Sequence, residues 1–217
     1  MILVAHRTPA TRAGCERVAA AGAGVFEADV QIDDDGALVV THYLPFGVGG
    51  RFERDNWRLR WHTGRLRDPR LAEVTDIVPA DCLVLLDLKE RRPDRRARLV
   101  AALIDALPDR SRFVVCGHPE EDVAALRAAG FRTWRSVGSR RHLAAVLAVD
   151  RLPDDAVTIR HSLLNVRTLD GLRERVPQVV AWTVNSVGRA RDLRALGVDG
   201  VTTDRTAVLQ LLSAIAN

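Results

Sequence analysis

Two acidic residues, Glu27 and Asp29, stand two positions apart in the run 25–32. Side chains alternate between the faces of a strand, so both carboxylates point to the same face. Like charges side by side repel each other unless something positive lies between them, and a divalent cation with a preference for oxygen ligands is the usual solution. The spacing alone is more typical of a solvated surface strand, so the rest of the chain must decide.

A second pair repeats this spacing in the run 83–89, which holds Asp87 and Lys89. Glu27, Asp29 and Asp87 together could bind one Mg²⁺ or Ca²⁺ ion with open positions for water. Lys89 and Arg7 are suited to a phosphate, Lys89 as a point charge and Arg7 as a planar fork.

Two histidines follow apolar runs near the start of the chain, His6 after 2–5 and His42 at the end of 37–41. Histidine exchanges protons near neutral pH and is the usual side chain for general acid–base catalysis. The chain thus offers carboxylates that could bind a metal, cationic side chains that could bind a phosphate, and two histidines that could transfer protons. Together these groups indicate metal-assisted cleavage of a phosphodiester.

The elements that must position these residues are strands alternating with helices, which favours a parallel sheet. About eight strands in 217 residues predict an α/β fold, a (β/α)8 TIM barrel, whose active site lies where the strands end. An open doubly wound sheet is less favoured because no G-x-G-x-x-G follows the first strand. The predicted strands are 2–5, 25–32, 83–89, 113–116, 133–137, 156–161, 179–185 and 200–204, and the predicted helices are 11–21, 93–107, 120–129, 140–149, 168–175, 187–196 and 207–216.

We expect residues 1–217 to form a single domain with one short excursion after the second strand, at about 43–75. The stretch 43–73 lacks clean periodicity, and we interpret it as a long loop or a small excursion. Its glycines at 47, 49 and 50 do not form a P-loop, because no Lys-Ser or Lys-Thr follows them.

Composition restricts the partners. The net charge is +4, from 32 basic and 28 acidic residues, and no basic stripe with aromatic residues appears, so we expect a small anionic substrate and no nucleic acid. Three cysteines without a CxxC motif predict buried thiols in a reducing compartment. No apolar run reaches transmembrane length and no signal peptide is visible, so we expect a cytoplasmic protein without stable membrane insertion. The oligomeric state stays open.

The order of these motifs resembles the glycerophosphodiester phosphodiesterase family, within the wider phosphatidylinositol phospholipase C-like group of barrels. The resemblance covers nearly the whole chain. Its motifs are His-Arg at 6–7, Glu-x-Asp at 27–29, Asp-Gly at 35–36, Val-Val-x-His at 39–42, acid-x-Lys at 87–89, Trp-Thr-Val-Asn at 182–185 and Gly-Val-Asp-Gly-Val-x-Thr-Asp at 197–204.

The resemblance implies metal-dependent hydrolysis of glycerophosphodiesters to glycerol 3-phosphate and an alcohol. The metal would hold a glycerol hydroxyl, so the substrate's own 2-hydroxyl could attack phosphorus before water completes the hydrolysis. It also implies the roles of individual residues, which are catalysis for His6 and His42, metal binding for Glu27, Asp29 and Asp87, phosphate binding for Arg7 and Lys89, and shaping of the substrate groove for Trp182.

The chain departs from the family pattern at four places. Thr8 replaces the glycine after His-Arg, 8–11 is a shortened substitute for Pro-Glu-Asn-Thr, Tyr43 replaces an aspartate, and Asp87 replaces the longer glutamate. These departures leave two alternatives. One is a lyase of the same barrel type that forms a cyclic phosphate from a lysophospholipid or a glycerophosphodiester. The other is a catalytically silent homologue that binds a ligand.

Overall fold

The computed structural model describes residues 1–41, 68–90, 92–117 and 119–215, together with the backbone of three strands between 43 and 63. Eight parallel strands form a sheet that closes on itself because β1 pairs with both β2 and β12. The barrel strands, in order around it, are β1 (Ile2–Ala5), β2 (Val25–Ile32), β7 (Leu83–Leu88), β8 (Phe113–Gly117), β9 (Arg132–Val137), β10 (Ala156–Arg160), β11 (Gln178–Trp182) and β12 (Gly200–Thr203).

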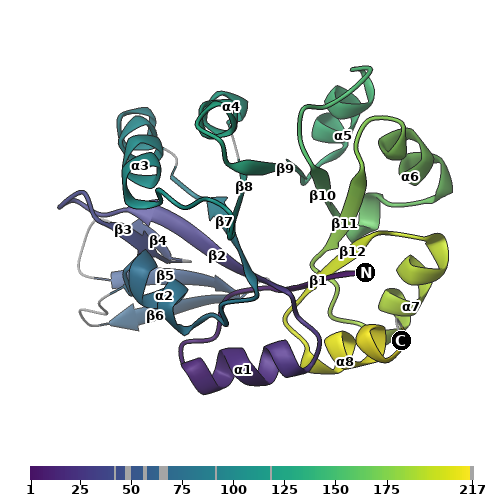
Figure 1. Cartoon of the computed structure of the whole chain (residues 1–217), viewed down its shortest axis with the longest axis horizontal. Coiled ribbons are helices and arrows are strands. Elements are labelled where there is room, and N and C mark those ends of the chain that lie inside the picture. The colour runs from purple at the N-terminus through teal and green to yellow at the C-terminus, as the bar shows by residue number, and fades with distance from the viewer. Residues whose placement is uncertain are drawn as a thin grey trace.

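Helices surround these strands (Figure 1). They are α1 (Arg12–Ala20), α2 (Leu71–Ile77), α3 (Pro93–Ala106), α4 (Glu120–Ala128), α5 (Arg140–Leu147), α6 (Val166–Arg173), α7 (Val187–Leu196) and α8 (Thr206–Ala214), with a short 3-10 turn η1 (His161–Leu163) before α6. The predicted (β/α)8 barrel is therefore confirmed, and the predicted strands and helices agree with the observed ones to within two residues at nearly every boundary.

Local sequence signals explain where several helices begin and end. The side chains of Thr11, Ser139, Asn165 and Ser186 each accept a hydrogen bond from a backbone N–H in the first turn of the helix that follows. Gly197 ends α7 with φ of 97°, a left-handed conformation that glycine adopts at little cost. These caps fix where each helix begins or ends relative to its barrel strand.

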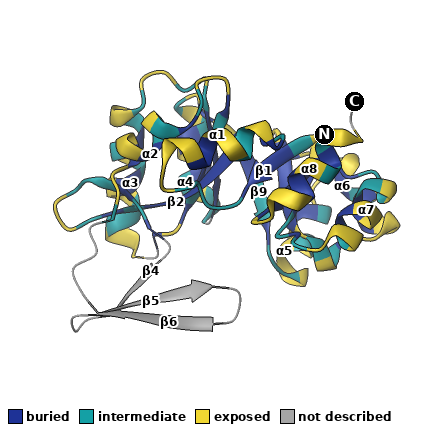
Figure 2. Ribbon diagram, turned by 90° about the horizontal axis from the view of Figure 1, so that it is seen from below, coloured by how far each residue is buried: buried dark blue, intermediate teal, exposed yellow. Residues whose placement is uncertain are grey.

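Two apolar layers hold the barrel together. The larger layer lies between the strands and the helices, and the smaller one fills the barrel interior. Figure 2 shows buried residues along the strands and exposed residues on the outer surfaces of the helices. The interior layer consists of Val4, Val25, Leu85, Val114, Cys116, Trp134, Ala156 and Val180.

The segment after β2 contains more regular structure than its sequence suggested. β3 (Leu38–Val40) pairs antiparallel with β2 across a turn at 33–36, as the Asp-Asp-Gly sequence predicts. β4 (Tyr43–Phe46), β5 (Gly50–Asp55) and β6 (Arg58–Thr63) form a separate antiparallel sheet. Of the two interpretations of 43–73, the small excursion is the one observed, although the sequence analysis assigned no strands within it and α2 already begins at Leu71. The alternation of charged and apolar residues in 58–61 was the missed strand signal.

In the described part of the chain, no helix is both long and apolar enough to cross a membrane.

Candidate active site

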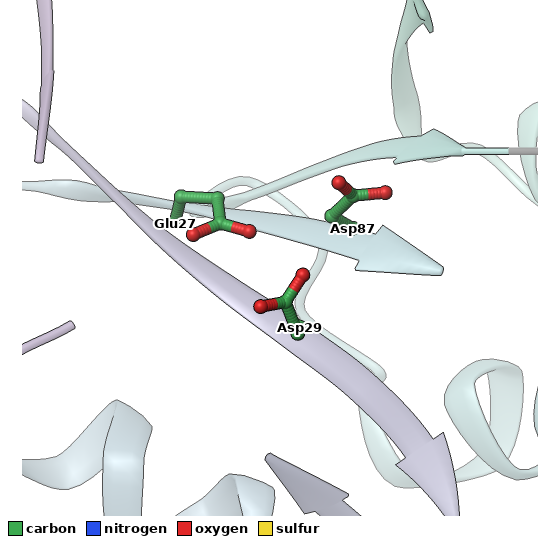
Figure 3. A group of neighbouring side chains, drawn as sticks. All are labelled: Glu27, Asp29 and Asp87. Carbon is green, nitrogen blue, oxygen red and sulfur yellow. The ribbon is translucent and has the colours of Figure 1, made fainter. Parts of the chain in front are cut away.

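Three carboxylates converge inside one end of the barrel. Phe26 and Val30 face the outer layer, so Glu27 and Asp29 face the interior, and the register of β2 with β7 places Asp87 directly beside Asp29. One carboxylate oxygen from each of Glu27, Asp29 and Asp87 lies within 4.8 Å of the others. Figure 3 shows the three side chains pointing toward a common space between the strands. The predicted metal ligands are therefore brought together.

The electrostatics of this cluster differ from those of surface acids. Glu27 and Asp29 are 4% and 3% exposed, which excludes the solvated-strand interpretation. Burial and the neighbouring charge of Asp87 raise the pKa of Glu27 to about 7, although Lys89 and Arg7 partly oppose the shift. The ionised cluster is thus short of positive charge.

Lys89 is the cation that lies among these acids. Its Nζ is 3.1 Å from Asp29 Oδ1 and forms a closer ion pair with Asp87. Burial of the ammonium opposes its charge, but Asp87 and Glu27 outweigh this effect and raise the pKa of Lys89. One lysine among three carboxylates leaves an excess of negative charge. Oxygen ligands on rigid strands with an excess of negative charge fit a hard divalent cation.

His6 is held by a chain of hydrogen bonds on the neighbouring strand ends. Its Nδ1 lies 2.6 Å from Asp204 Oδ1, and the other oxygen of Asp204 accepts from Asn185 Nδ2 at 2.6 Å. Asn185 Oδ1 in turn accepts from the Asp204 backbone N–H at 2.9 Å and from Thr203 Oγ1 at 3.1 Å. An ionised carboxylate can only accept, so Nδ1 carries the proton and Nε2 is the nitrogen whose lone pair can accept one.

Asp204 is ionised throughout the physiological pH range. Burial alone would raise its pKa, but the hydrogen bonds from His6 and Asn185 and the positive charges of His6 and Arg7 outweigh burial and lower it to about 2. A carboxylate in this position orients the imidazole and stabilises its protonated form.

The loop after β1 ties His6 to the acidic cluster. Arg7 has φ of 63°, an uncommon value for a residue with a side chain, and its backbone N–H donates to Glu27 Oε2 at 2.8 Å. Thr8 donates to the Glu27 carbonyl twice, from its backbone N–H at 2.8 Å and from its Oγ1 at 2.9 Å. Thr8 therefore adds a hydrogen bond that the glycine of the family pattern cannot make.

These groups surround a cavity of about 320 Å³. The acids and His6 form one wall, and Trp182 forms part of the opposite wall. The lining residues are His6, Glu27, Leu85, Asp87, Leu88, Lys89, Glu90, Cys116, Gly117, Ser136, Thr158, Trp182, Thr183 and Thr202. A cavity of this size suits a small molecule rather than a polymer.

The structure thus brings His6, Lys89 and Trp182 into one cavity with Glu27 and Asp87, and Asp29 lies beside these two acids. Arg7 adjoins Glu27 through its backbone N–H. His42, the second predicted catalytic histidine, lies outside the described residues. The sequence analysis included Asp204 and Asn185 in the family motifs at 197–204 and 182–185 but assigned neither residue to the active site. The available signal was that the first and last strands of a closed barrel are neighbours, which places the residues that follow β1 and β12 side by side.

Comparison with known proteins identifies the family of the chain. The model of the glycerophosphoryl diester phosphodiesterase family matches residues 88–208, more than half of the chain. Comparison with curated proteins finds no sequence match. The chain therefore belongs to the glycerophosphoryl diester phosphodiesterase family, whose members are phosphoric diester hydrolases, and the predicted membership is confirmed.

Solved structures share the fold over the full length of the chain. A phosphodiesterase from Oleispira antarctica, in complex with the product sn-glycerol-3-phosphate, is 18% identical with a TM-score of 0.74, covering 100% of this chain and 97% of its own. A glycerophosphodiester phosphodiesterase from Thermotoga maritima is 20% identical with a TM-score of 0.71, covering 99% of this chain and 98% of its own.

Proposed function

We propose that this enzyme hydrolyses glycerophosphodiesters to glycerol 3-phosphate and an alcohol, with a divalent metal ion as cofactor. The observation that carries the proposal is the convergence of Glu27, Asp29 and Asp87 beside His6 in one cavity. The Oleispira neighbour, which holds sn-glycerol-3-phosphate in the same fold, supports this choice of product.

Glu27, Asp29 and Asp87 would hold the metal, which we expect to be Mg²⁺ or Ca²⁺ because all three supply carboxylate oxygens. When bound, such an ion neutralises charge on phosphoryl oxygens and polarises a coordinated hydroxyl. Arg7 and Lys89 then bind the remaining phosphate charge. With a divalent ion held by the three acids, Lys89 would be able to exchange its ion pairs with Asp29 and Asp87 for an ion pair with a phosphate oxygen.

His6 is the candidate general base. With its Nδ1 proton directed to Asp204, its Nε2 accepts a proton from the hydroxyl that attacks phosphorus, and Asp204 stabilises the imidazolium that results. The bond between phosphorus and the oxygen of the departing alcohol breaks, and that oxygen takes up a proton. His42 is the proposed donor of this proton. Where the attacking hydroxyl is the substrate's own 2-hydroxyl, this step leaves a cyclic phosphate, and water then attacks its phosphorus and breaks the bond to the 2-oxygen, which gives glycerol 3-phosphate. Asp204 and Asn185 are positioning residues in this scheme, and Trp182 shapes the groove for the substrate.

The place of the enzyme in the cell is part of the proposal. Glycerophosphodiesters are deacylated phospholipids, so the reaction belongs to lipid metabolism. Cys15, Cys82 and Cys116 are buried free thiols, in keeping with a reducing compartment, and we therefore propose a cytoplasmic location.

The test is turnover of glycerophosphoethanolamine with Mg²⁺, Ca²⁺ or EDTA, followed by phosphorus NMR of the products. We expect glycerol 3-phosphate only when a divalent ion is present. The His6→Ala variant should lose at least about 10³-fold in kcat/KM, because it removes the proton acceptor. The matched control, His142→Ala, removes an exposed histidine on α5 and should keep wild-type activity.

Each departure from this result has a distinct meaning. A cyclic phosphate as the final product would replace hydrolysis with the lyase reaction. Tight Mg²⁺ binding without turnover of any glycerophosphodiester would favour a ligand-binding homologue. Full activity in the His6→Ala variant would remove His6 from the reaction.

A further inference from the structure

Arg160 lies over the face of Trp182, a residue that lines the cavity. The guanidinium carbon of Arg160 is 5.6 Å from the centre of the Trp182 ring, a cation–π contact. The register of β10 with β11 pairs these two residues directly, so the contact is built into the sheet. Arg160 is exposed, whereas Trp182 lines the cavity.

The alternation of side chains along β10 directs Arg160 toward the mouth of the cavity. Ala156 belongs to the layer that fills the barrel interior, and Thr158 lines the cavity. Arg160 is the next residue on that same face, and it stands one step closer to the open end. A molecule that fills the cavity above Thr158 would therefore meet the guanidinium.

The position of β10 in the barrel sets Arg160 opposite the acidic cluster. Three strands separate β10 from β2 in either direction around the barrel, namely β7, β8 and β9 on one side and β1, β12 and β11 on the other. The cavity thus has an acidic wall at β2 and β7, where the proposed function places a metal and a phosphate, and an opposite wall at β10 and β11 with Arg160 beside it.

One further cation lies near Arg160. It is not His161, because burial together with the charges of Arg189 and Arg160 lowers the pKa of that imidazole and so disfavours its charged form. Arg189 Nη2 donates to the His161 carbonyl at 2.6 Å, which fixes a second guanidinium nearby. A quaternary ammonium or an amine is repelled here, and the Trp182 face that could otherwise attract it is already covered by Arg160.

We propose that Arg160 is a specificity residue that selects phosphodiesters whose alcohol carries a carboxylate or another anionic group. This inference rests on the proposed function. The glycerol half of the substrate is uncharged, so a charged residue on the far wall can discriminate only between alcohols. A guanidinium held by stacking has little conformational freedom to lose, and it presents its N–H groups as a fork to a carboxylate.

The test compares glycerophosphoserine with glycerophosphoethanolamine, whose alcohols differ only in one carboxylate. We expect the wild-type enzyme to favour the serine ester by about tenfold in kcat/KM. Arg160→Ala should remove most of this preference, and Arg160→Glu should reverse it in favour of the ethanolamine ester. Arg191→Ala, a matched removal of an exposed arginine on α7, should keep the wild-type ratio.

The ratio separates selectivity from a structural role. If Arg160 only packs against Trp182, both substrates will lose activity equally and the ratio will stay unchanged, which overturns the inference while the proposed function stands. Wild-type enzyme that turns over neither ester, with metal present, overturns the proposed function and this inference with it.

Discussion

Acidic side chains are buried in two regions of the barrel. In one region arginines balance the negative charge, and in the other an excess of negative charge remains. Outside the barrel wall, the completely buried carboxylate of Asp154 accepts from Arg127 at 2.7 Å, from Arg135 at 3.0 Å and from the Thr133 hydroxyl at 2.8 Å. Glu120 lies 2.6 Å from Arg135, so two carboxylates face two guanidinium groups. Inside the mouth, three carboxylates share one lysine.

The difference separates a structural charge from a functional one. The Asp154 network is balanced in charge and well hydrogen-bonded, so it binds α4 and β9 together and needs no ligand. The Glu27 cluster keeps like charges together at an electrostatic cost, which makes it selective for a cation and leaves it less stable without one.

The largest effect is expected for Glu27→Gln, which keeps an oxygen to accept the Arg7 N–H but removes one charge. We expect kcat/KM to fall at least about 10³-fold, equivalent to about 4 kcal/mol, and Mg²⁺ affinity by calorimetry to fall with it. The free energy of unfolding in EDTA should stay equal or rise, by up to about 2 kcal/mol, because a buried repulsion is relieved. Glu174→Gln on the surface is the control, and a marked loss of stability in Glu27→Gln would contradict the contrast.

For Asp154→Asn we expect a smaller effect, and we expect it on stability rather than on activity. This change leaves two partly buried arginines without their shared carboxylate, and the free energy of unfolding should fall by about 3 kcal/mol. The kcat per folded molecule should remain within about threefold of wild type. Denaturant unfolding and activity at low temperature measure the two quantities. Asp155→Asn, the exposed neighbour, should change neither, and equal stability of the two variants would show that the network contributes nothing.

The smallest effect concerns pH and Asp204. Its pKa is lowered to about 2 in the folded protein and returns to about 3.8 on unfolding, so ionised Asp204 stabilises the fold above about pH 4. This contribution, of order 2 kcal/mol, is lost as pH falls from 4 to 2. The difference in unfolding free energy between wild type and Asp204→Asn should therefore shrink over that range. A difference that is constant from pH 7 to pH 2 would contradict the His6–Asp204 ion pair.

Most of the fold was predictable because most barrel strands are rich in apolar residues and most helices carry a start or stop signal of their own. The acidic cluster was predictable in part, since the two-residue spacings at 27–29 and 87–89 place each pair on one face of its strand, and the predicted barrel brings the ends of those strands together. The assignment to a phosphodiesterase family followed from the order of these motifs along the whole chain. The roles of individual residues stay predictions.

The features of the site that the sequence did not predict depend on contacts between strand ends that are distant in the sequence. Asp204 and Asn185 follow β12 and β11, and nothing in the sequence near either residue indicates a hydrogen-bonded chain to His6. The stacking of Arg160 on Trp182 needs the register of β10 against β11, which no pattern within either strand specifies. The effect of Thr8 depends on the backbone conformation of Arg7, a left-handed value that sequence reasoning would assign first to glycine.

The contact between His6 and Asp204 spans 198 positions of the chain, and it has a consequence for how the enzyme matures during synthesis. β1 emerges from the ribosome first, but its hydrogen-bonded neighbour along four positions is β12, which emerges last among the strands. The proposed base therefore acquires its carboxylate only when the barrel closes. Fragments that stop before β12 carry all three acids and His6 yet lack the aligned imidazole. Such a chain holds the proposed metal ligands without the proposed base in position, so we expect activity only after β12 has closed the barrel.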